Sequence, residues 1–381
     1  MRLSTTCLAA LLAAGAAEAG GLDRSGQSVE PLFEEGRWIQ FSYGYVSPDV
    51  SGTQAVPLGP QSPAGASSGD ALESYSQFGL AFKDDVSDRI SYAVIFDQPF
   101  GADVDYGLNT TYFGRGSTAE LDADALTVLL RYRFDGGVSV HGGLRYQELG
   151  AKAFVPFVTA PEGPTAGVPY EADGDRDGGI GYTAGVAYER PEIALRVALT
   201  YHSEVEHEIG TSETSAFAAG AVDSVTDVET PQSVNLDFQT GVAPGTLLFG
   251  NVRWVDWSDF DITPATFSGV TGIPLVGYEN DYTSYSIGVG RRFNDSFSGA
   301  LTLGYEDGDA AFVTNLGPTD GAYSVGLGGT YTVGALELTG GVRYVKLMST
   351  QTTLSSLPGV TVSEFEDNDA VAVGLQVGYR F

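Results

Sequence analysis

The segment from Val371 to Phe381 alternates strictly between large apolar side chains and small or polar ones. One face carries Val371, Val373, Leu375, Val377, Tyr379 and Phe381, and the other carries Ala372, Gly374, Gln376, Gly378 and Arg380. A period of two is typical of a β-strand with two different faces. The same pattern returns at 126–134, 193–202 and 336–344, so the chain is predicted to be built from strands.

About fourteen such segments follow one another along the chain. They lie near 37–47, 72–83, 89–97, 121–134, 137–149, 178–189, 192–204, 232–242, 245–257, 281–293, 296–306, 321–332, 335–347 and 368–381. Short turns alternate with long loops rich in Gly, Ser, Thr, Asp and Pro. An even strand number, segments of about ten residues and this asymmetry of connections are typical of an outer-membrane barrel. We therefore predict an all-β fold, a 14-stranded antiparallel transmembrane β-barrel over residues 37–381.

A large soluble sandwich or β-helix would share the alternation. The positions of aromatic residues favour the membrane barrel, because girdles of aromatic side chains mark both membrane interfaces. Such residues gather near the segment ends, at Tyr43, Tyr45, Tyr132, Tyr146, Tyr188, Tyr201, Tyr305, Tyr344 and Tyr379. The aromatic C-terminal residue, Phe381, is typical of substrates of the barrel-assembly machinery, which we expect to be a partner.

The N-terminal residues predict export. Residues 1–19 carry a positive charge at Arg2, an apolar stretch and the small-x-small pattern Ala17-Glu18-Ala19, which together indicate a signal peptide. Cleavage there leaves a cysteine-free chain that begins at Gly20, with a short segment, 20–36, before the first strand. We expect the outer membrane of a Gram-negative bacterium, with the lipid bilayer and lipopolysaccharide as partners.

The charge is strongly negative, with 19 Lys and Arg against 49 Asp and Glu, a net charge of -30. A nucleic acid would be repelled over most of this surface, so no nucleic-acid partner is predicted. The basic residues fall on the small or polar face of the strands, which would be the lumen: Arg131, Arg133, His141, Arg145, Arg196, His202, Arg253, Arg343 and Arg380. They could meet a carboxylate ligand, or they could brace the wall by pairing with acids such as Glu189, Asp237 and Glu337.

Other chemistry is set aside. Asp173, Asp175 and Asp177 begin like a calcium loop, but Ala184 stands at the twelfth position, where calcium needs a bidentate Glu. Calcium binding there is left open. No nucleophile elbow, phosphate loop or convergent Ser, His and acid set is visible, so we predict no enzyme, no metal site and no cofactor.

Several motifs resemble the FadL/TodX family of outer-membrane transporters. Trp254-Val255-Asp256-Trp257-Ser258-Asp259-Phe260, after Pro231, resembles the family's W-x-x-W-S-x-F stretch. Tyr201-His202-Ser203-Glu204-Val205 resembles its Y-R-S-E-V strand end, with His202 where Arg is usual. The stretch from Ala93 to Gly101 resembles its third strand.

This resemblance implies a monomer that takes up long-chain fatty acids or other hydrophobic compounds such as aromatic hydrocarbons, and releases them sideways at a kink in the third strand. Here that lateral gate would comprise Asp97, Gln98, Pro99, Phe100 and Gly101. Pro99 has no N–H for a ladder, so a gap is physically reasonable there, as is an ordinary strand end. The family's longer N-terminal plug with N-P-A is missing, and 20–36 would be a short remnant.

Two functions follow from these patterns. In the favoured one, apolar residues of the loops capture a hydrophobic molecule, and lumen arginines attract its head group. The loop residues are Leu58, Phe154, Phe157, Phe217, Phe267 and Leu275, and the arginines are Arg131, Arg133, Arg145 and Arg196. In the alternative, the protein is a general or anion-preferring porin, and the same arginines form a wet selectivity filter for small polar solutes.

Overall fold

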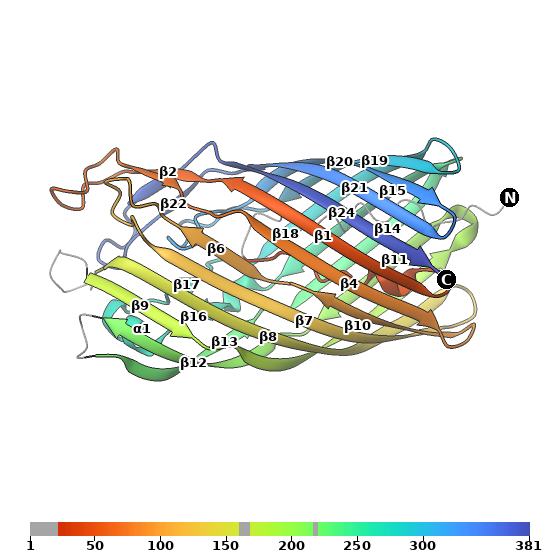
Figure 1. Ribbon diagram of the computed structural model, residues 1–381, viewed down its shortest axis with the longest axis horizontal. Coiled ribbons are helices and arrows are strands. Elements are labelled where there is room, and N and C mark those ends of the chain that lie inside the picture. Colours follow the sequence, from red (N-terminus) through yellow and green to blue (C-terminus); the bar gives the residue numbers. More distant parts are fainter. Residues whose placement is uncertain (1–21, 160–167, 216–219) are drawn as a thin grey trace.

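A closed antiparallel barrel forms the body of the protein, in a computed structural model that describes residues 22–159, 168–215 and 220–381 (Figure 1). Fourteen strands follow one another around the wall, and the barrel closes where the first, β1, pairs with the last, β24. They are β1 (Trp38–Asp49), β4 (Tyr75–Asp85), β5 (Ile90–Asp97), β7 (Thr118–Arg133), β8 (Val138–Val158), β10 (Asp177–Arg190), β11 (Leu195–His202), β14 (Ser233–Ala243), β15 (Thr246–Val255), β18 (Tyr282–Arg292), β19 (Phe297–Glu306), β20 (Ala322–Val333), β21 (Leu336–Leu347) and β24 (Asp369–Arg380).

The remaining elements lie mostly toward the end of the barrel with the long connections, opposite the C-terminus (Figure 1). Barrels of this type carry their long loops on the extracellular side. These elements are β2 (Ser51–Gln54), β3 (Ser67–Asp70), β6 (Gly101–Asp105), β9 (Val168–Gly174), β12 (Val205–Ser215), β13 (Val222–Thr230), β16 (Asp261–Ile262), α1 (Ala265–Thr271), β17 (Val276–Gly277), β22 (Thr350–Thr352) and β23 (Ser363–Phe365), with the short 3-10 turns η2 (Glu30–Phe33), η3 (Pro191–Ile193) and η4 (Trp257–Asp259).

The fourteen-stranded barrel is confirmed, and each predicted segment overlaps one spanning strand. The two faces are also as predicted. On β7, Leu130 is 60% exposed on the outside, whereas the next residue, Arg131, is 2% exposed and faces the interior. Among the described residues, no helix combines the length and apolar character needed to cross a membrane.

The long loops contain more strand than the sequence predicts. Strands β9, β12 and β13 extend the wall beyond β10, β11 and β14, and β2, β3, β22 and β23 form a separate four-stranded sheet. In β12 the residues alternate between buried and exposed, yet both faces are rich in Thr, Ser and Glu. An apolar period is therefore absent, and the pattern cannot separate these strands from a polar loop.

A glycine makes a close contact at the barrel seam, where β24 pairs with β1. A Cβ at Gly378 of β24 would lie 2.1 Å from ring carbons of Trp38, a fully buried side chain at the start of β1. We expect Gly378→Ala to destabilise the folded barrel by about 1–3 kcal/mol, because the ring has to move out of a packed site. This change is measured by unfolding in urea, with the folded fraction read from the heat-modifiable migration of the barrel on a gel.

The matched control is Gly340→Ala on the neighbouring strand β21, where the new methyl group would meet the end of Leu375 at 3.3 Å and Gly374 O at an ordinary 3.8 Å. Equal unfolding midpoints for the two variants would show that Trp38 does not hold the seam in this way.

Candidate functional site

The third spanning strand is broken. It consists of β5 and β6, separated by Gln98, Pro99 and Phe100, and both parts pair with β7. Asp97 pairs with Ala125 and Gly101 with Asp122, so four steps on this strand match three on β7. The strand therefore carries one extra residue, which is a β-bulge. Pro99, which cannot donate to a ladder, lies inside it.

On its other side, the third strand separates from β4. Their ladder ends at Leu80 and Phe96, and pairing resumes only at the bridge between Leu72 and Val104. Between these points lie residues 73–79 on one side and 97–103 on the other, and in this stretch the described residues form no ladder pair between the two strands. The closed wall is thus interrupted over the length of the kink.

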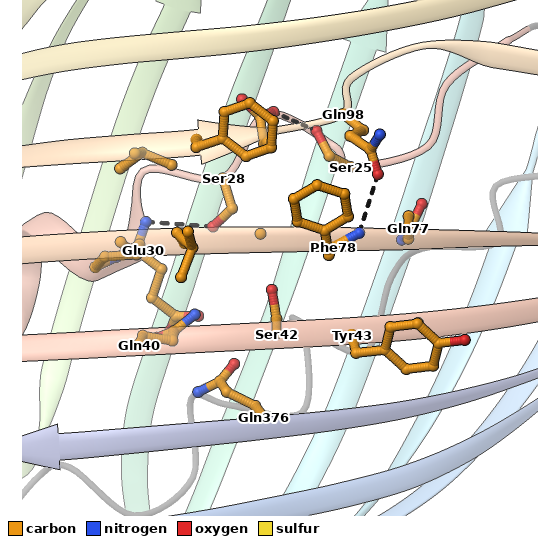
Figure 2. A pocket seen from close by; sticks show the side chains of 18 of the residues that line it. Ser25, Ser28, Glu30, Gln40, Ser42, Tyr43, Gln77, Phe78, Gln98 and Gln376 are labelled. Carbon is orange, nitrogen blue, oxygen red and sulfur yellow. Dashed lines mark hydrogen bonds between the residues drawn. The ribbon is translucent and has the colours of Figure 1, made fainter.

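A cavity of about 100 Å³ occupies this interruption (Figure 2). Its lining includes Ser42, which alternates to the interior of β1, together with Tyr43 and Phe78, which are 41% and 45% exposed on the outside. The cavity is therefore lined by residues of both faces of the wall. We call it the wall cavity.

The N-terminal segment, residues 22–37, pairs with the kink from the interior. Asp23 forms an antiparallel bridge with Phe100. Arg24 N donates to Pro99 O at 2.8 Å, and Gly101 N donates to Leu22 O at 2.9 Å. These bonds satisfy backbone groups of the third strand that β4 leaves without a ladder partner.

Arg24 lies at the edge of the interruption nearer the long loops. Its guanidinium forms a 2.6 Å ion pair with Asp103 and lies 3.9 Å from the ring centroid of Tyr75. A Cβ at Gly101 would come within 2.3 Å of the guanidinium carbon, so a larger residue there would force Arg24 out of its present position. The residue joins the N-terminal segment, β4 and β6.

A buried ion pair fixes the segment to the opposite wall. Asp23 and Arg253 of β15 lie 2.5 Å apart, and their side chains are 2% and 1% exposed. Arg253 also donates to Ser233, Asn235 and Gln27. All these contacts make removal of either charged partner costly, because the other would be left buried and unpaired.

Further along, acids of the segment hold lumen arginines. Glu30 lies 2.9 Å from Arg196, and Glu34 lies 2.9 Å from Arg380 of the last strand. Burial raises the pKa of Glu30 to about 7 in spite of the nearby Arg196 charge, and burial also raises the pKa of Glu34. The segment therefore crosses the interior from the kink to the end of the barrel with the short turns.

A larger cavity, the extracellular pocket, lies among the long loops. It has a volume of about 420 Å³, within the range of small-molecule sites. Eight aromatic side chains line it: Tyr106, Tyr112, Phe113, Phe157, Phe260, Phe267, Tyr278 and Phe312. Among the described residues of its lining there is no Lys, Arg or His, whereas Asp261 and Glu279 are present. The pocket is thus apolar and carries no positive charge from its walls.

Aromatic contacts connect this pocket with the kink. Trp257, which is 1% exposed, packs against Phe260 and Tyr278 with ring centroids 5.3 and 5.0 Å apart. On its other side it meets Phe100 edge-on at 5.6 Å. Burial raises the pKa of Tyr278, so its phenol stays neutral.

Two smaller cavities lie between the extracellular pocket and the N-terminal segment. Both share Leu316 with that pocket, and both are lined by Leu22 and Ala102. The second one, of about 100 Å³, reaches Arg24 and Tyr75. The wall cavity begins on the far side of Arg24, at Ser25 and Gln77. A series of cavities thus leads from the loops to the kink, interrupted by the N-terminal segment.

Helix α1, one wall of the extracellular pocket, is held by a buried acid. Glu213 of β12 is 0% exposed and accepts hydrogen bonds from Thr266 N, Phe267 N and the Tyr170 hydroxyl at 2.8–3.0 Å. Two of these donors are free N–H groups of the first helical turn, which a carboxylate stabilises.

Glu213→Ala is expected to lower ligand affinity of the extracellular pocket about tenfold, because it leaves several buried donors without an acceptor and frees α1 to move. Binding measured by titration calorimetry tests this. Glu171→Ala, which removes an exposed acid from the adjacent strand β9, is the control and should bind as the parent does. Equal affinities for the two variants would contradict the positioning role of Glu213.

Each lumen arginine predicted to bind substrate lies beside an acid. Arg131 pairs with Glu189, Arg133 with Asp85, Arg145 with Asp97, and Arg196 with Glu30. Arg131 also lies over the Phe33 ring of the N-terminal segment. Arg196 lies over the same ring, so these two arginines are near neighbours that share Phe33. Three of the four arginines contact the N-terminal segment or the kink.

The predicted loop phenylalanines are dispersed. Phe157 lines the extracellular pocket and contacts Phe113. Phe154 is 36% exposed on the outer face of β8 and is not part of that lining. Phe217 lies outside the described residues. The predicted gate residues, from Asp97 to Gly101, do lie together at the kink, with Phe100 buried and Asp97 accepting from Ser25 at 2.5 Å.

Sequence reasoning missed most of the aromatic lining. Tyr106, Tyr112, Phe113 and Phe312 stand in loops without periodicity. Of the predicted capture residues, Phe267 and Leu275 line the pocket together with Phe157, and Phe260 is the last residue of the tryptophan motif. At the possible calcium loop, Asp173 forms an ion pair with Lys152, and Asp177 accepts from Glu208 N. The described residues contain no group of three or more His, Cys, Asp or Glu arranged to hold a metal ion.

A closed antiparallel barrel with an apolar outer face and long loops at one end defines an outer-membrane β-barrel. The family profile described as outer membrane protein transport protein (OMPP1/FadL/TodX) matches residues 32–381. The chain therefore belongs to this family of Gram-negative outer membrane proteins, which is a family of transport proteins. A search of curated protein sequences finds no match.

Solved structures agree with this assignment. A FadL homologue of Pseudomonas aeruginosa superposes with a TM-score of 0.77 at 14% identity, over 99% of this chain and 98% of that one. The toluene transporter TodX of P. putida gives 0.65 at 12% identity, over 92% and 91%. The toluene transporter TbuX of Ralstonia pickettii gives 0.58 at 15% identity, again over 92% and 91%. At these identities the likeness concerns the fold.

Proposed function

We propose that this protein takes up uncharged hydrophobic molecules, aromatic ones above all, and releases them sideways into the outer membrane. The observation that carries the proposal is the extracellular pocket, in which eight aromatic side chains surround about 420 Å³. Aromatic rings offer apolar area and edge-to-face contacts to a ring-shaped ligand. Two of the similar structures are described as toluene transporters, which supports this class of ligand.

The charges favour a neutral ligand over a fatty acid. A carboxylate entering the extracellular pocket would meet Asp261 and Glu279 and no described basic side chain of the lining. Deeper in the barrel, Arg131, Arg145 and Arg196 already have carboxylate partners. Moving an unpaired anion into such surroundings is costly. The arginines therefore hold the N-terminal segment and the wall in place, and they do not bind the head group of a ligand.

The path supports lateral release. The N-terminal segment crosses the interior and would act as a plug, tied to the wall by Arg253 and Arg196. The wall cavity lies beside it and reaches outward-facing side chains. The free energy of a hydrophobic molecule that leaves this cavity is lower in lipid than in water, by about 25 cal/mol for each Å² of apolar surface. No energy source is needed.

A matched pair of ligands tests this function. Naphthalene and 2-naphthoate share their ring system and differ by one carboxylate. The purified protein should bind naphthalene saturably, should bind 2-naphthoate at least about tenfold more weakly, and should show low conductance in a planar bilayer. Large, steady conductance that neither ligand changes would instead favour the porin.

A further inference from the structure

The side chain of Gln98 occupies the place of a missing backbone bond in the wall. Val86 N donates to Ile90 O at the turn between β4 and β5, so even-numbered residues of β4 direct their N–H groups toward the third strand. Leu80 is the last of these in the ladder, and Phe78 comes next. Phe78 N donates instead to the side-chain oxygen Oε1 of Gln98, at 3.0 Å (Figure 2).

The other end of the same amide is also held. Gln98 Nε2 donates to Asp124 Oδ1 of β7 at 3.1 Å, and Asp124 accepts from Arg176 at 2.6 Å. The amide therefore connects β4 with β7 across the bulge, without the help of the ladder. Rotation of the Gln98 side chain alone would break both of these hydrogen bonds.

The surroundings of the amide are apolar. Phe78 and Phe96, on the two strands that separate, stack with ring centroids 5.4 Å apart, and both line the wall cavity with Gln98. A hydrophobic molecule passing between these strands has to occupy the space of the amide. The molecule cannot replace the two hydrogen bonds, so their loss contributes to the barrier.

We propose that the Gln98 side chain holds the lateral opening closed, and that its displacement by the ligand limits the rate of release into the membrane. This inference rests on the proposed function. It assigns a positioning role to one side chain, whose hydrogen bonds keep the opening closed to lipid while no ligand is present.

Gln77 provides a control within the same cavity. It lines the wall cavity from β4, but its Oε1 has no hydrogen-bond partner among the described residues. Gln77→Ala removes as many atoms as Gln98→Ala, from the same cavity, without removing a bond across the interruption. Gln98→Met adds a second comparison, because it keeps the length of the side chain and removes only its hydrogen bonds.

The experiment measures naphthalene release from protein in lipid nanodiscs to acceptor vesicles by stopped-flow fluorescence. We expect Gln98→Ala and Gln98→Met to release naphthalene at least about fivefold faster than the parent. This is the effect of removing one or two ordinary hydrogen bonds that have to break before release. Equilibrium affinity of the extracellular pocket should stay unchanged in both. Gln77→Ala should release at the parent rate.

If Gln98→Ala and Gln98→Met release naphthalene at the parent rate and still bind it, the role of Gln98 is refuted and the proposed function is not. Faster release by Gln77→Ala to the same degree would also refute the role of Gln98, since the effect would then come from cavity size. A parent protein that does not bind naphthalene would overturn the proposed function, and this inference with it.

Discussion

Ser42→Phe is expected to reduce naphthalene uptake about tenfold or more, because the phenyl ring would occupy the wall cavity and a ligand forced past it would overpack the site, at a cost of about 1–3 kcal/mol. Ser42 lines the wall cavity from β1, opposite Gly79 of β4, where a Cβ would already lie 2.7 Å from the serine oxygen. A phenyl ring at this position has to fill the cavity itself. Uptake by cells that express equal amounts of folded protein measures the effect.

The control for this variant is Ser286→Phe. Ser286 lies on β18 between Tyr285 and Ile287, which are 44% and 49% exposed on the outside, so the serine faces the lumen away from the kink. It should leave uptake within about twofold of the parent, since the proposed path does not pass it. Equal loss in both variants would show that the lumen as a whole, rather than the wall cavity, carries the ligand.

Arg253→Ala is expected to release the N-terminal segment and to raise the ionic conductance of the barrel severalfold. The substitution leaves Asp23 buried without its partner, which typically costs about 3–5 kcal/mol. Water can relieve this cost only if residues near Asp23 leave their site, and their departure opens the interior. Single-channel recording in a planar bilayer shows the change directly.

Arg89→Ala is the matched control. Arg89 pairs with Asp135 at the surface, where the two side chains are 54% and 89% exposed, and such pairs contribute little. The conductance of the Arg89→Ala variant should equal that of the parent protein. If Arg253→Ala conducts no more than Arg89→Ala while both barrels are folded, the segment is not the plug of this channel.

The barrel itself could be predicted from the sequence because its strands obey a simple physical rule. Leu375 faces lipid and Gln376 faces the interior, at 64% and 7% exposure, as their alternation predicts. The position of the kink came from the family resemblance, which implies one in the third strand, and Pro99 agrees with it because it removes a ladder donor there. The alternation depends on local chemistry, which a single sequence contains.

Two expected wall acids, Glu189 and Glu337, do pair with Arg131 and Arg380. The acids that the N-terminal segment supplies could not be predicted in the same way. Arg253 meets Asp23, 230 positions away, and Arg196 meets Glu30, because the N-terminal segment enters the barrel. No periodic pattern in residues 22–37 predicts that docking. Part of the aromatic lining was missed for a similar reason, since Tyr112 and Phe312 come together only through loop packing.

Photolabelling tests lateral release most directly. A neutral aryl diazirine, bound to the protein in outer-membrane vesicles and activated by light, labels the residues that line its route. Lateral release predicts labels at the extracellular pocket and then at Phe78, Phe96 and Gln98 in the wall. Labels that bypass these residues and continue along the lumen to Arg380, at the short-turn end, would contradict release through the wall.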